Sequence, residues 1–404
     1  MKKYTIIITA LLLTLTEAAA CTSFIISGRV TPDGRPMMFK NRDTSNLDNL
    51  TAIIKGEKYW FAGITAANDK GATQIWSGHN ETGFAIMNTA AFNLNEKDGP
   101  IELEGVVMRR ALEICETLED FEHFLDTLSR PMRVDANFGV IDARGGCAYY
   151  ETGHETYVKF DCNDKRLAPY GYMVRTNNAY TGDHSKDIGV ERYLAISHIM
   201  GRSEMKGFDT APNLLDECSR HLVNGLTGID LHDYMPDDES KPRYMPISDY
   251  ITRHDTSCAV VIQGVRKGEN PLFTTSWTIV GNPYTTVAIP VWLLPCHSLP
   301  EVITYGKEGG STLCRAGLKL KEQLFPLKRG NTERYINVAM LINKSGTGIL
   351  QQLRPLEKRL VSEAEKVLDE ARKAGVATNS MKEYYNKVDR EVRTFYASAF
   401  NIKL

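Results

Sequence analysis

The sequence predicts a layered α+β protein. Short runs rich in β-branched and aromatic residues, bounded by Gly, Asp and Asn, recur from about residue 21 to residue 291. Amphipathic helical periodicity appears between these runs and again near the end of the chain. With 404 residues, of which 42% are hydrophobic, the chain is long enough to bury a large core between strands and helices.

The amino-acid composition limits the kinds of partner that the protein could bind. The 48 Lys and Arg residues nearly balance the 50 Asp and Glu residues, so the formal net charge is -2. A nucleic-acid-binding domain would carry an excess of basic residues, and none is present overall. No stretch after residue 20 is apolar over the roughly 20 residues that a transmembrane helix needs. We therefore expect no nucleic-acid partner and no transmembrane segment.

Residues 1–20 have the features of a secretory signal peptide. Lys2 and Lys3 precede an apolar run, 4–15, and the small residues Ala18-Ala19-Ala20 follow it. Cleavage after Ala20 would export a mature chain, 21–404, that begins with Cys21, to the periplasm or the extracellular space. The alternative is a lipoprotein anchored at Cys21, although position 18 holds Ala where a lipidation signal usually has Leu.

The predicted mature chain opens with a β-hairpin. Its first strand lies within 22–27, its turn is 31–35 and its returning strand begins at Met37. Asp43 lies at the end of that returning strand. Further strands are predicted over 83–89, 137–142, 147–152, 171–176, 258–264, 273–280 and 285–291.

Helices are predicted from apolar spacing and capping residues. A helix over 103–114 is followed by another that begins at Thr117, where Asp120 completes a capping-box pattern. Two more are predicted over 191–200 and 212–222. The apolar stripe from Leu356 to Ala371 predicts an amphipathic helix packed on the body, within a helical extension over about 351–404.

The eight cysteines favour buried free thiols over a metal site. If Cys21 is set aside, seven remain, an odd number that cannot pair completely within the chain. The sequence contains no C-x-x-C motif, which disfavours a zinc site. A small disulfide scaffold is also disfavoured, because the chain is long enough to build a hydrophobic core.

Cys21 is the residue on which the chemistry converges. After cleavage it would carry both a thiol and a free α-amine, whose ordinary pKa of about 7.7 to 8.0 makes it a usable base near neutral pH. Asp43, at the end of the neighbouring strand, could hold that amine in place. His79, or His254 with Asp255, could instead serve one of the internal cysteines, but no recognisable motif surrounds them.

The motifs resemble the N-terminal nucleophile (Ntn) hydrolases of the linear-amide group, which includes choloylglycine hydrolases, penicillin V acylases and acyl-CoA:6-aminopenicillanate acyltransferases. The resemblance runs in order from Cys21 to about Val261. It rests on the following segments: Cys21-Thr22 with Phe24; Lys40-Asn41-Arg42-Asp43; Asn80-Glu81-Thr82-Gly83; Asp142-Ala143-Arg144-Gly145 through Glu151; Thr176-Asn177-Asn178; and Glu191-Arg192-Tyr193.

The resemblance implies a four-layer αββα sandwich with added C-terminal helices, and it implies roles for particular residues. Cys21 would be the nucleophile, Asp43 would bind its amine, Asn177 would donate to the oxyanion and Arg192 would support the site. Substrate or oxyanion contacts would come from Lys40, Asn88 and the backbone near Ala90. Neither a cofactor nor a metal is implied. Lys40 stands where bile-salt hydrolases carry Arg, which disfavours bile-salt specificity.

The resulting expectation is an exported cysteine amidohydrolase that cleaves a linear amide C–N bond in a small molecule through a thioester on Cys21. A homo-oligomer is compatible with the sequence. The alternatives are an acyltransferase of the same fold, a C69-type dipeptidase and a non-enzymatic, lipid-anchored surface protein.

Overall fold

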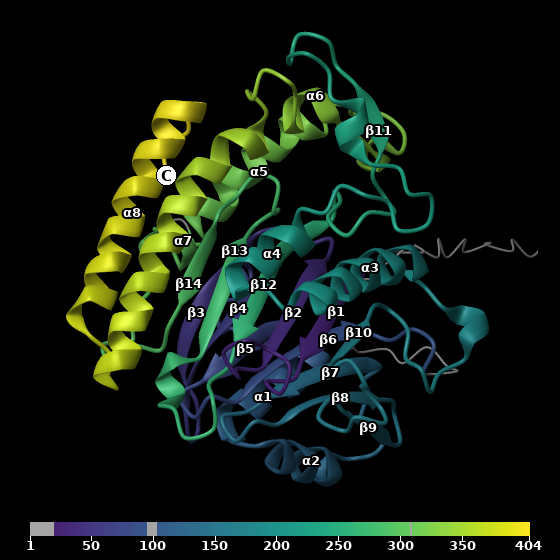
Figure 1. Ribbon diagram of the computed structural model, residues 1–404, viewed down its shortest axis with the longest axis vertical. Coiled ribbons are helices and arrows are strands. Elements are labelled where there is room, and N and C mark those ends of the chain that lie inside the picture. The colour runs from purple at the N-terminus through teal and green to yellow at the C-terminus, as the bar shows by residue number, and fades with distance from the viewer. Residues whose placement is uncertain (1–19, 95–102, 308) are drawn as a thin grey trace, which may run out of the picture.

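The computed structural model describes residues 20–94, 103–307 and 309–404, which form two β-sheets packed face to face with helices on both outer sides (Figure 1). The predicted signal peptide lies outside the described residues except for Ala20. The elements therefore form four layers, in the order helix, sheet, sheet, helix. This arrangement confirms the predicted αββα sandwich.

The first sheet is antiparallel and contains the N-terminal strand in its interior. Its strand order is β10-β1-β2-β12-β13-β14. β1 pairs with β2 on one side and β10 on the other, and all six of its residues are buried because the helices cover one face and the second sheet the other. The strands are β1 Cys21–Ile26, β2 Met37–Asp43, β10 Tyr172–Arg175, β12 Thr256–Gln263, β13 Thr275–Val280 and β14 Ala288–Val291.

The second sheet is a meander in which each strand pairs with the next along the chain. Its strands are β3 Asn49–Lys55, β4 Trp60–Ala66, β5 Ser77–Asn80, β6 Ala85–Ala90, β7 Ala136–Ile141, β8 Cys147–Thr152 and β9 Tyr157–Asp161. A separate two-stranded sheet joins β11 Tyr244–Pro246 to β15 Tyr335–Asn337.

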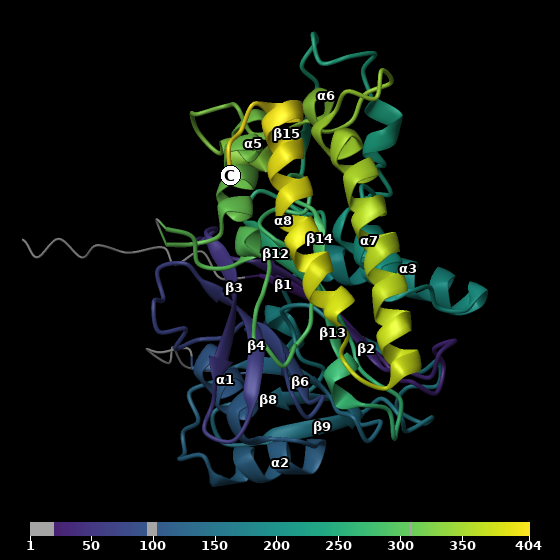
Figure 2. The same cartoon turned by 90° about the vertical axis from the view of Figure 1, so that its left-hand side faces the viewer.

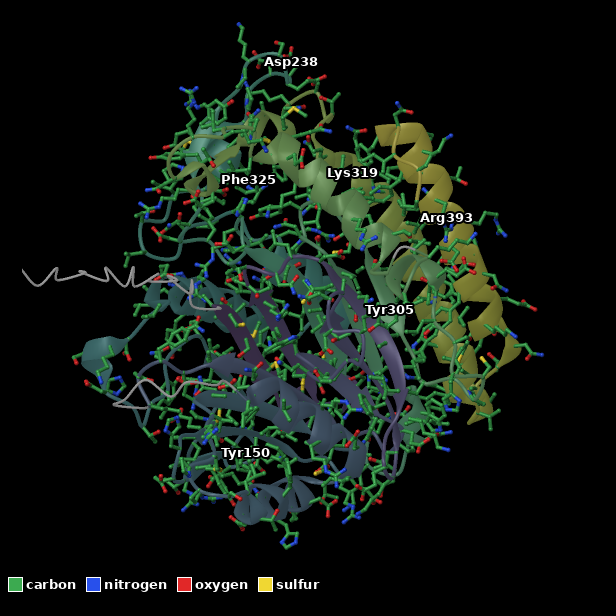
Figure 3. The ribbon with its side chains drawn as sticks, turned by 180° about the vertical axis from the view of Figure 1, so that it is seen from behind. Tyr150, Asp238, Tyr305, Lys319, Phe325 and Arg393 are labelled. Carbon is green, nitrogen blue, oxygen red and sulfur yellow. The ribbon has the colours of Figure 1, made fainter. Side chains whose placement is uncertain are left out.

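Helices cover the two outer faces unequally. The second sheet is covered by α1 Glu104–Ile114 and α2 Leu118–Thr127, and the Tyr150 hydroxyl of β8 donates to Glu122 of α2 at 2.8 Å. The first sheet is covered by a larger set: α3 Val190–Lys206, α4 Ala211–Ser219, α5 Thr312–Leu324, the short α6 Val338–Leu341, α7 Ile349–Ala374 and α8 Asn379–Phe400. Helices α7 and α8 lie side by side along this face (Figure 2), and Figure 3 shows Arg393 on α8 far from Tyr150.

The space between the two sheets is filled mainly by apolar side chains, among them Ile25, Met38 and Val260 from the first sheet and Ile141 from the second. Polar contacts also cross it: the hydroxyls of Ser23 and Tyr149 are 2.7 Å apart, Lys40 Nζ donates to Asn88 Oδ1 at 2.6 Å, and His79 Nδ1 lies 2.7 Å from Ser276 Oγ. Side chains of β1 therefore alternate: one set faces the second sheet and the other faces the helices.

The elements that the sequence predicts are present, with shifted boundaries. The capping box of Thr117 and Asp120 is formed at the start of α2. The strand predicted over 285–291 begins only at Ala288, because Thr285 and Thr286 donate back to the Asn282 carbonyl in a turn.

All eight cysteines are free thiols, and Cys296 is exposed whereas the others are buried. In the described part of the chain, no helix has the length and apolarity to cross a bilayer.

A buried ion pair fixes α7 to the first sheet. Arg220, at the end of α4, donates to both carboxylate oxygens of Glu357 on α7, at 2.5 and 2.7 Å. The same carboxylate accepts from the Ala288 N–H of β14 at 2.6 Å. Arg220 is almost fully buried and also pairs with Asp216 at 2.7 Å, so the loss of the Glu357 charge would leave Asp216 as its remaining carboxylate.

We predict that Glu357→Gln lowers the free energy of unfolding by about 1.5 to 3 kcal/mol, the usual worth of hydrogen bonds to a charged group, because Asp216 still pairs with Arg220. Urea denaturation followed by circular dichroism measures it. Glu363→Gln is the matched control, because Glu363 pairs with Lys387 on the surface and such pairs contribute about 0 to 1 kcal/mol. Equal effects of the two substitutions would contradict the assignment.

Candidate active site

Cys21 begins β1 at the edge of the interlayer space. It lies opposite Arg42 in the register with β2, and its side chain is on the face that Ser23 presents to the second sheet. Only 4% of the residue is exposed. The thiol therefore lies between the two sheets, close to where β1 begins.

The Cys21 backbone nitrogen donates to Asn177 Oδ1 at 2.9 Å. The same oxygen accepts from Arg192 Nη2 at 3.0 Å, and Asn177 Nδ2 donates to the Ala90 carbonyl at 3.0 Å. Because Oδ1 accepts from two donors and Nδ2 faces a carbonyl, the orientation of the Asn177 side-chain amide is determined. Three residues predicted from the sequence are thus brought together at Cys21.

Arg192 lies in the first turn of α3 and is 1% exposed. Its Nη1 donates to the Cys21 carbonyl at 2.5 Å and to Thr22 Oγ1 at 3.1 Å. The preceding Gly189 has a φ of 87°, and a Cβ there would lie 2.2 Å from the guanidinium. Glycine at this position therefore allows both the backbone turn and the approach of Arg192 to the site.

Asp43 contacts the site through its backbone. Its N–H donates to the carbonyl of Ala20 at 3.0 Å, beside the bond between residues 20 and 21. Its carboxylate accepts from Thr256 Oγ1 at 2.5 Å and from Arg253 Nη2 at 2.8 Å. Burial raises the pKa of Asp43, and Arg253 and Arg192 oppose that effect.

The predicted role of Asp43 in binding the Cys21 amine stays a prediction, because in this structure Cys21 is still joined to Ala20. Sequence motifs did not identify Arg253 and Thr256, which bind the Asp43 carboxylate. Both lie more than two hundred residues from Asp43, and the only available signal was their position just before the strand predicted over 258–264.

Lys40 is buried on the same face of β2 as Arg42. Its Nζ donates to Asn88 Oδ1 at 2.6 Å and to the Trp76 carbonyl at 2.7 Å. Burial lowers the pKa of Lys40 to about 8. The structure thus places Lys40 and Asn88 in contact, and it adds Trp76, which the sequence analysis missed.

Backbone N–H groups after β6 already have partners in this structure. Ala91 donates to the Asp135 carbonyl at 2.6 Å and Phe92 donates to the Asn177 carbonyl at 3.1 Å. The Ala90 carbonyl accepts from Asn177. Ala90 is therefore next to Asn177, and a backbone oxyanion donor at this position stays a prediction.

The two candidate histidines have other partners. His79 is buried with Nδ1 2.7 Å from Ser276 Oγ, and burial lowers its pKa to about 3, so it is neutral near pH 7. His254 pairs with the adjacent Asp255 at 2.8 Å. In the described ranges, neither ring is hydrogen-bonded to a cysteine, which disfavours a cysteine–histidine site.

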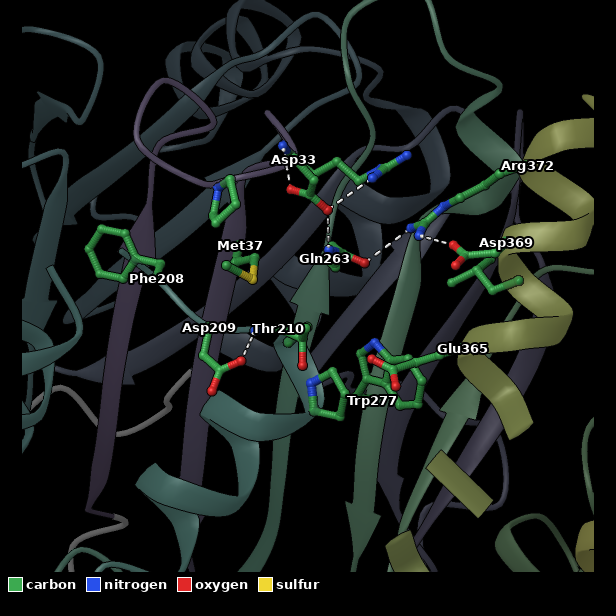
Figure 4. Close-up of a pocket in the computed structure, with 15 residues that line it drawn as sticks. Asp33, Met37, Phe208, Asp209, Thr210, Gln263, Trp277, Glu365, Asp369 and Arg372 are labelled. Carbon is green, nitrogen blue, oxygen red and sulfur yellow. Dashed lines mark hydrogen bonds and ion pairs between the residues drawn. The ribbon is translucent and has the colours of Figure 1, made fainter. Parts of the chain in front are cut away.

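Figure 4 shows a cavity, of about 610 Å³, whose lining does not include Cys21. Met37 and Gln263 line it, at the opposite end of β2 and β12 from Asp43, together with Trp277 and residues of α7 such as Arg372. None of the predicted site residues lines this cavity.

Comparisons with solved structures give distant similarities. A mutant conjugated bile acid hydrolase from Clostridium perfringens is 10% identical, with 68% of this chain and 92% of that chain covered and a TM-score of 0.41. Penicillin V acylase from Agrobacterium tumefaciens is 11% identical, with 68% and 86% covered and a TM-score of 0.36. No curated protein sequence matches the chain.

A protein-family model gives the firmer result. The model of the acyl-coenzyme A:6-aminopenicillanic acid acyl-transferase family matches residues 30–278, a segment that contains Asp43, Asn177 and Arg192. Since that match covers more than half of the chain, the protein belongs to this family, as its motifs predicted.

Proposed function

We propose that this protein is an exported Ntn amidohydrolase that cleaves a linear amide bond in a small molecule, non-peptide or small peptide. The observation that carries the proposal is the set of contacts at Cys21: its nitrogen binds Asn177 Oδ1 and its carbonyl binds Arg192. A buried cation, Lys40, lies on the same face of the first sheet as the Cys21 thiol. Family membership supports acyl-transfer chemistry of this class.

In the proposed mechanism, removal of residues 1–20 converts the Cys21 nitrogen into an α-amine. The amine takes the thiol proton, and the sulfur attacks the carbonyl carbon of the substrate. The carbonyl electron pair moves onto the oxygen and forms a tetrahedral oxyanion. When this intermediate collapses, the C–N bond breaks and the ammonium returns its proton to the leaving nitrogen. A free amine and a thioester on Cys21 result.

The second half of the reaction determines the enzyme class. Water that attacks the thioester would release an acid and restore the thiol, giving a hydrolase. A second amine would take the acyl group and give an acyltransferase, the second candidate, which the name of the matched family favours. Amine and acid release from N-acyl amides, penicillin V, conjugated bile salts and dipeptides, with and without an added amine, distinguishes these reactions and tests the dipeptidase alternative.

Three neighbours of Cys21 would support the reaction. We assign Asn177 to the oxyanion through Nδ2 and to the amine through Oδ1, since it already binds the Cys21 nitrogen. Arg192 would hold both Asn177 and the Cys21 carbonyl. Asp43, fixed by Arg253 and Thr256, would bind the ammonium that forms when the thiol is deprotonated.

Blocking the amine tests the central claim. One extra residue placed before Cys21 turns the amine into an amide, which has no basicity near neutral pH, so activity should disappear while the protein stays folded. A chain beginning Met-Cys21, from which aminopeptidase removes Met, should be active, and Cys21→Ser should be strongly impaired. If the extended and verifiably uncleaved protein is fully active, the Ntn mechanism is wrong.

Mass spectrometry of the exported protein tests the lipoprotein alternative. A free Cys21 at the N-terminus is expected for the amidohydrolase. A thioether-linked lipid on Cys21 would remove the nucleophile and identify a lipid-anchored surface protein instead.

Asn177→Ala should lower kcat by about 10²- to 10³-fold with a smaller change in KM, as expected when a transition-state donor is lost. Steady-state kinetics of the mature enzyme measure it. The matched control is Asn178→Ala, because the Asn178 side chain accepts from Thr176 and not from Cys21. Unchanged kcat in Asn177→Ala would exclude Asn177 from the reaction.

Lys40 should produce a decline of kcat/KM at alkaline pH. Because its pKa is lowered to about 8, the site loses one positive charge as the pH rises through 8. Lys40→Arg keeps the charge at all accessible pH values and should remove that decline. Lys159→Arg, on the distant strand β9, is the control. An identical alkaline decline in Lys40→Arg would show that Lys40 does not cause it.

A further inference from the structure

Arg42 is a buried cation directly opposite Cys21. Cys21 and Arg42 are paired in the register of β1 and β2, and Arg42 is paired with Cys258 in the register of β2 and β12. Directly paired residues of antiparallel strands point to the same face, with Cβ atoms about 4.5–5.5 Å apart. The guanidinium therefore lies between two thiols on the face turned toward the second sheet.

Neutral groups hold Arg42 in place. Its Nη1 donates to Asn49 Oδ1 at 2.9 Å and to Ser257 Oγ at 3.2 Å. The guanidinium carbon lies 4.5 Å from the centre of the Trp76 ring, which gives a cation–π contact. Arg42 is only 5% exposed, so water screens its positive charge poorly.

Other buried arginines of this protein pair with carboxylates, and Arg42 does not. Arg175 pairs with Glu151, Arg220 with Glu357, and Arg35 with both Asp33 and Glu269. Within the described part of the chain, no ion pair joins Arg42 to an acidic residue. Asp43 follows it in sequence but faces the helices, where it binds Arg253. A buried charge without a partner is costly, which indicates that an anion completes the site.

Two thiols could supply that anion. Cys258 lies in the apolar space between the sheets, and burial raises its pKa, which keeps it neutral. Cys21 lies at the start of β1, where the α-amine of the proposed mechanism would accept its proton. Of the two, Cys21 is therefore the thiol whose proton the proposed mechanism removes.

We propose that Arg42 is the permanent counter-ion of the Cys21 thiolate and sets the pH range in which Cys21 is nucleophilic. This inference rests on the proposed function, in which Cys21 is the nucleophile. The proton passes from the thiol to the α-amine, and the sulfur keeps the electron pair with which it attacks. Arg42 acts on the reacting sulfur by its charge alone and takes no proton.

Other charged groups surround the same thiol. Lys40 lies along β2, and Arg192 reaches the Cys21 carbonyl from α3. Further titratable or charged side chains on the packed elements are Cys258 on β12, Asp43 on the opposite face of β2, Arg175 on β10, Tyr149 on β8 and Glu104 on α1. Because the charge of Lys40 is lost near pH 8, Arg42 supplies the constant part of the positive potential.

The test is the pH dependence of Cys21 alkylation by iodoacetamide in the mature protein, quantified by mass spectrometry of the N-terminal peptide. Cys296→Ser serves as the background, because Cys296 is the exposed cysteine among the eight. Arg42→Gln removes the charge but keeps donors for Asn49 and Ser257. It should move the midpoint of the alkylation profile up by about one to three pH units and slow alkylation at pH 7 about tenfold or more.

Two further variants serve as controls. Arg42→Lys keeps the charge and should restore most of the wild-type profile. Arg266→Met removes one positive charge from the exposed loop after β12, at the far end of the strand, and should leave the profile unchanged. Arg42→Met, an apolar replacement of similar length, provides a second neutral variant if Arg42→Gln unfolds.

An unchanged midpoint in a folded Arg42→Gln or Arg42→Met protein would overturn the proposal. So would an equal shift in Arg266→Met, because it would reflect net charge and not local contact. Full amidase activity in Cys21→Ala would instead contradict the proposed function, and the two failures are thus distinguishable.

Discussion

The hydrogen bond from the Cys21 nitrogen to Asn177 Oδ1 determines the rest of the site. It joins the first strand to the segment after β10, 156 residues further along the chain. It can form because β1 lies between β10 and β2, so that residues following β10 lie beside the start of β1. Arg192 binds the same oxygen from α3 and thereby ties the outer helix layer to Cys21. A change in the pairing of β1 would move all three groups.

Positive charge is the second property of the site. Lys40, Arg42 and Arg192 are buried near Cys21, and the nearby Asp43 carboxylate is engaged by Arg253. Burial lowers the pKa of Lys40 and of Arg192, so the protein forms this region against a desolvation cost. That cost is offset when negative charge appears, as it does in the proposed reaction, first on the sulfur and then on the substrate oxygen.

The sequence predicts those parts of the fold and site that have local signals. The strands around residues 85–90 and 136–152 and the start of α2 follow from turn residues, alternation and the Thr117 cap. Strand β5, Ser77–Asn80, has no such pattern, because its Ser, Gly, His and Asn are strand residues only through their neighbours. The contacts of Asp43 with Arg253 and Thr256 depend on the pairing of β2 with β12, which no local motif encodes.

The bond between Ala20 and Cys21 is held on both sides before any cleavage: Asp43 binds the Ala20 carbonyl and Asn177 accepts from the Cys21 nitrogen. In the proposed mechanism, cleavage removes that carbonyl and leaves the Asp43 N–H without its acceptor, while the nitrogen gains hydrogens that need acceptors of their own. Asn177 Oδ1 can keep one of them. The proposal assigns another to the Asp43 carboxylate, whose backbone N–H lies beside the same peptide bond. In this proposal the site is assembled by folding, and processing would change the chemistry of one nitrogen within it.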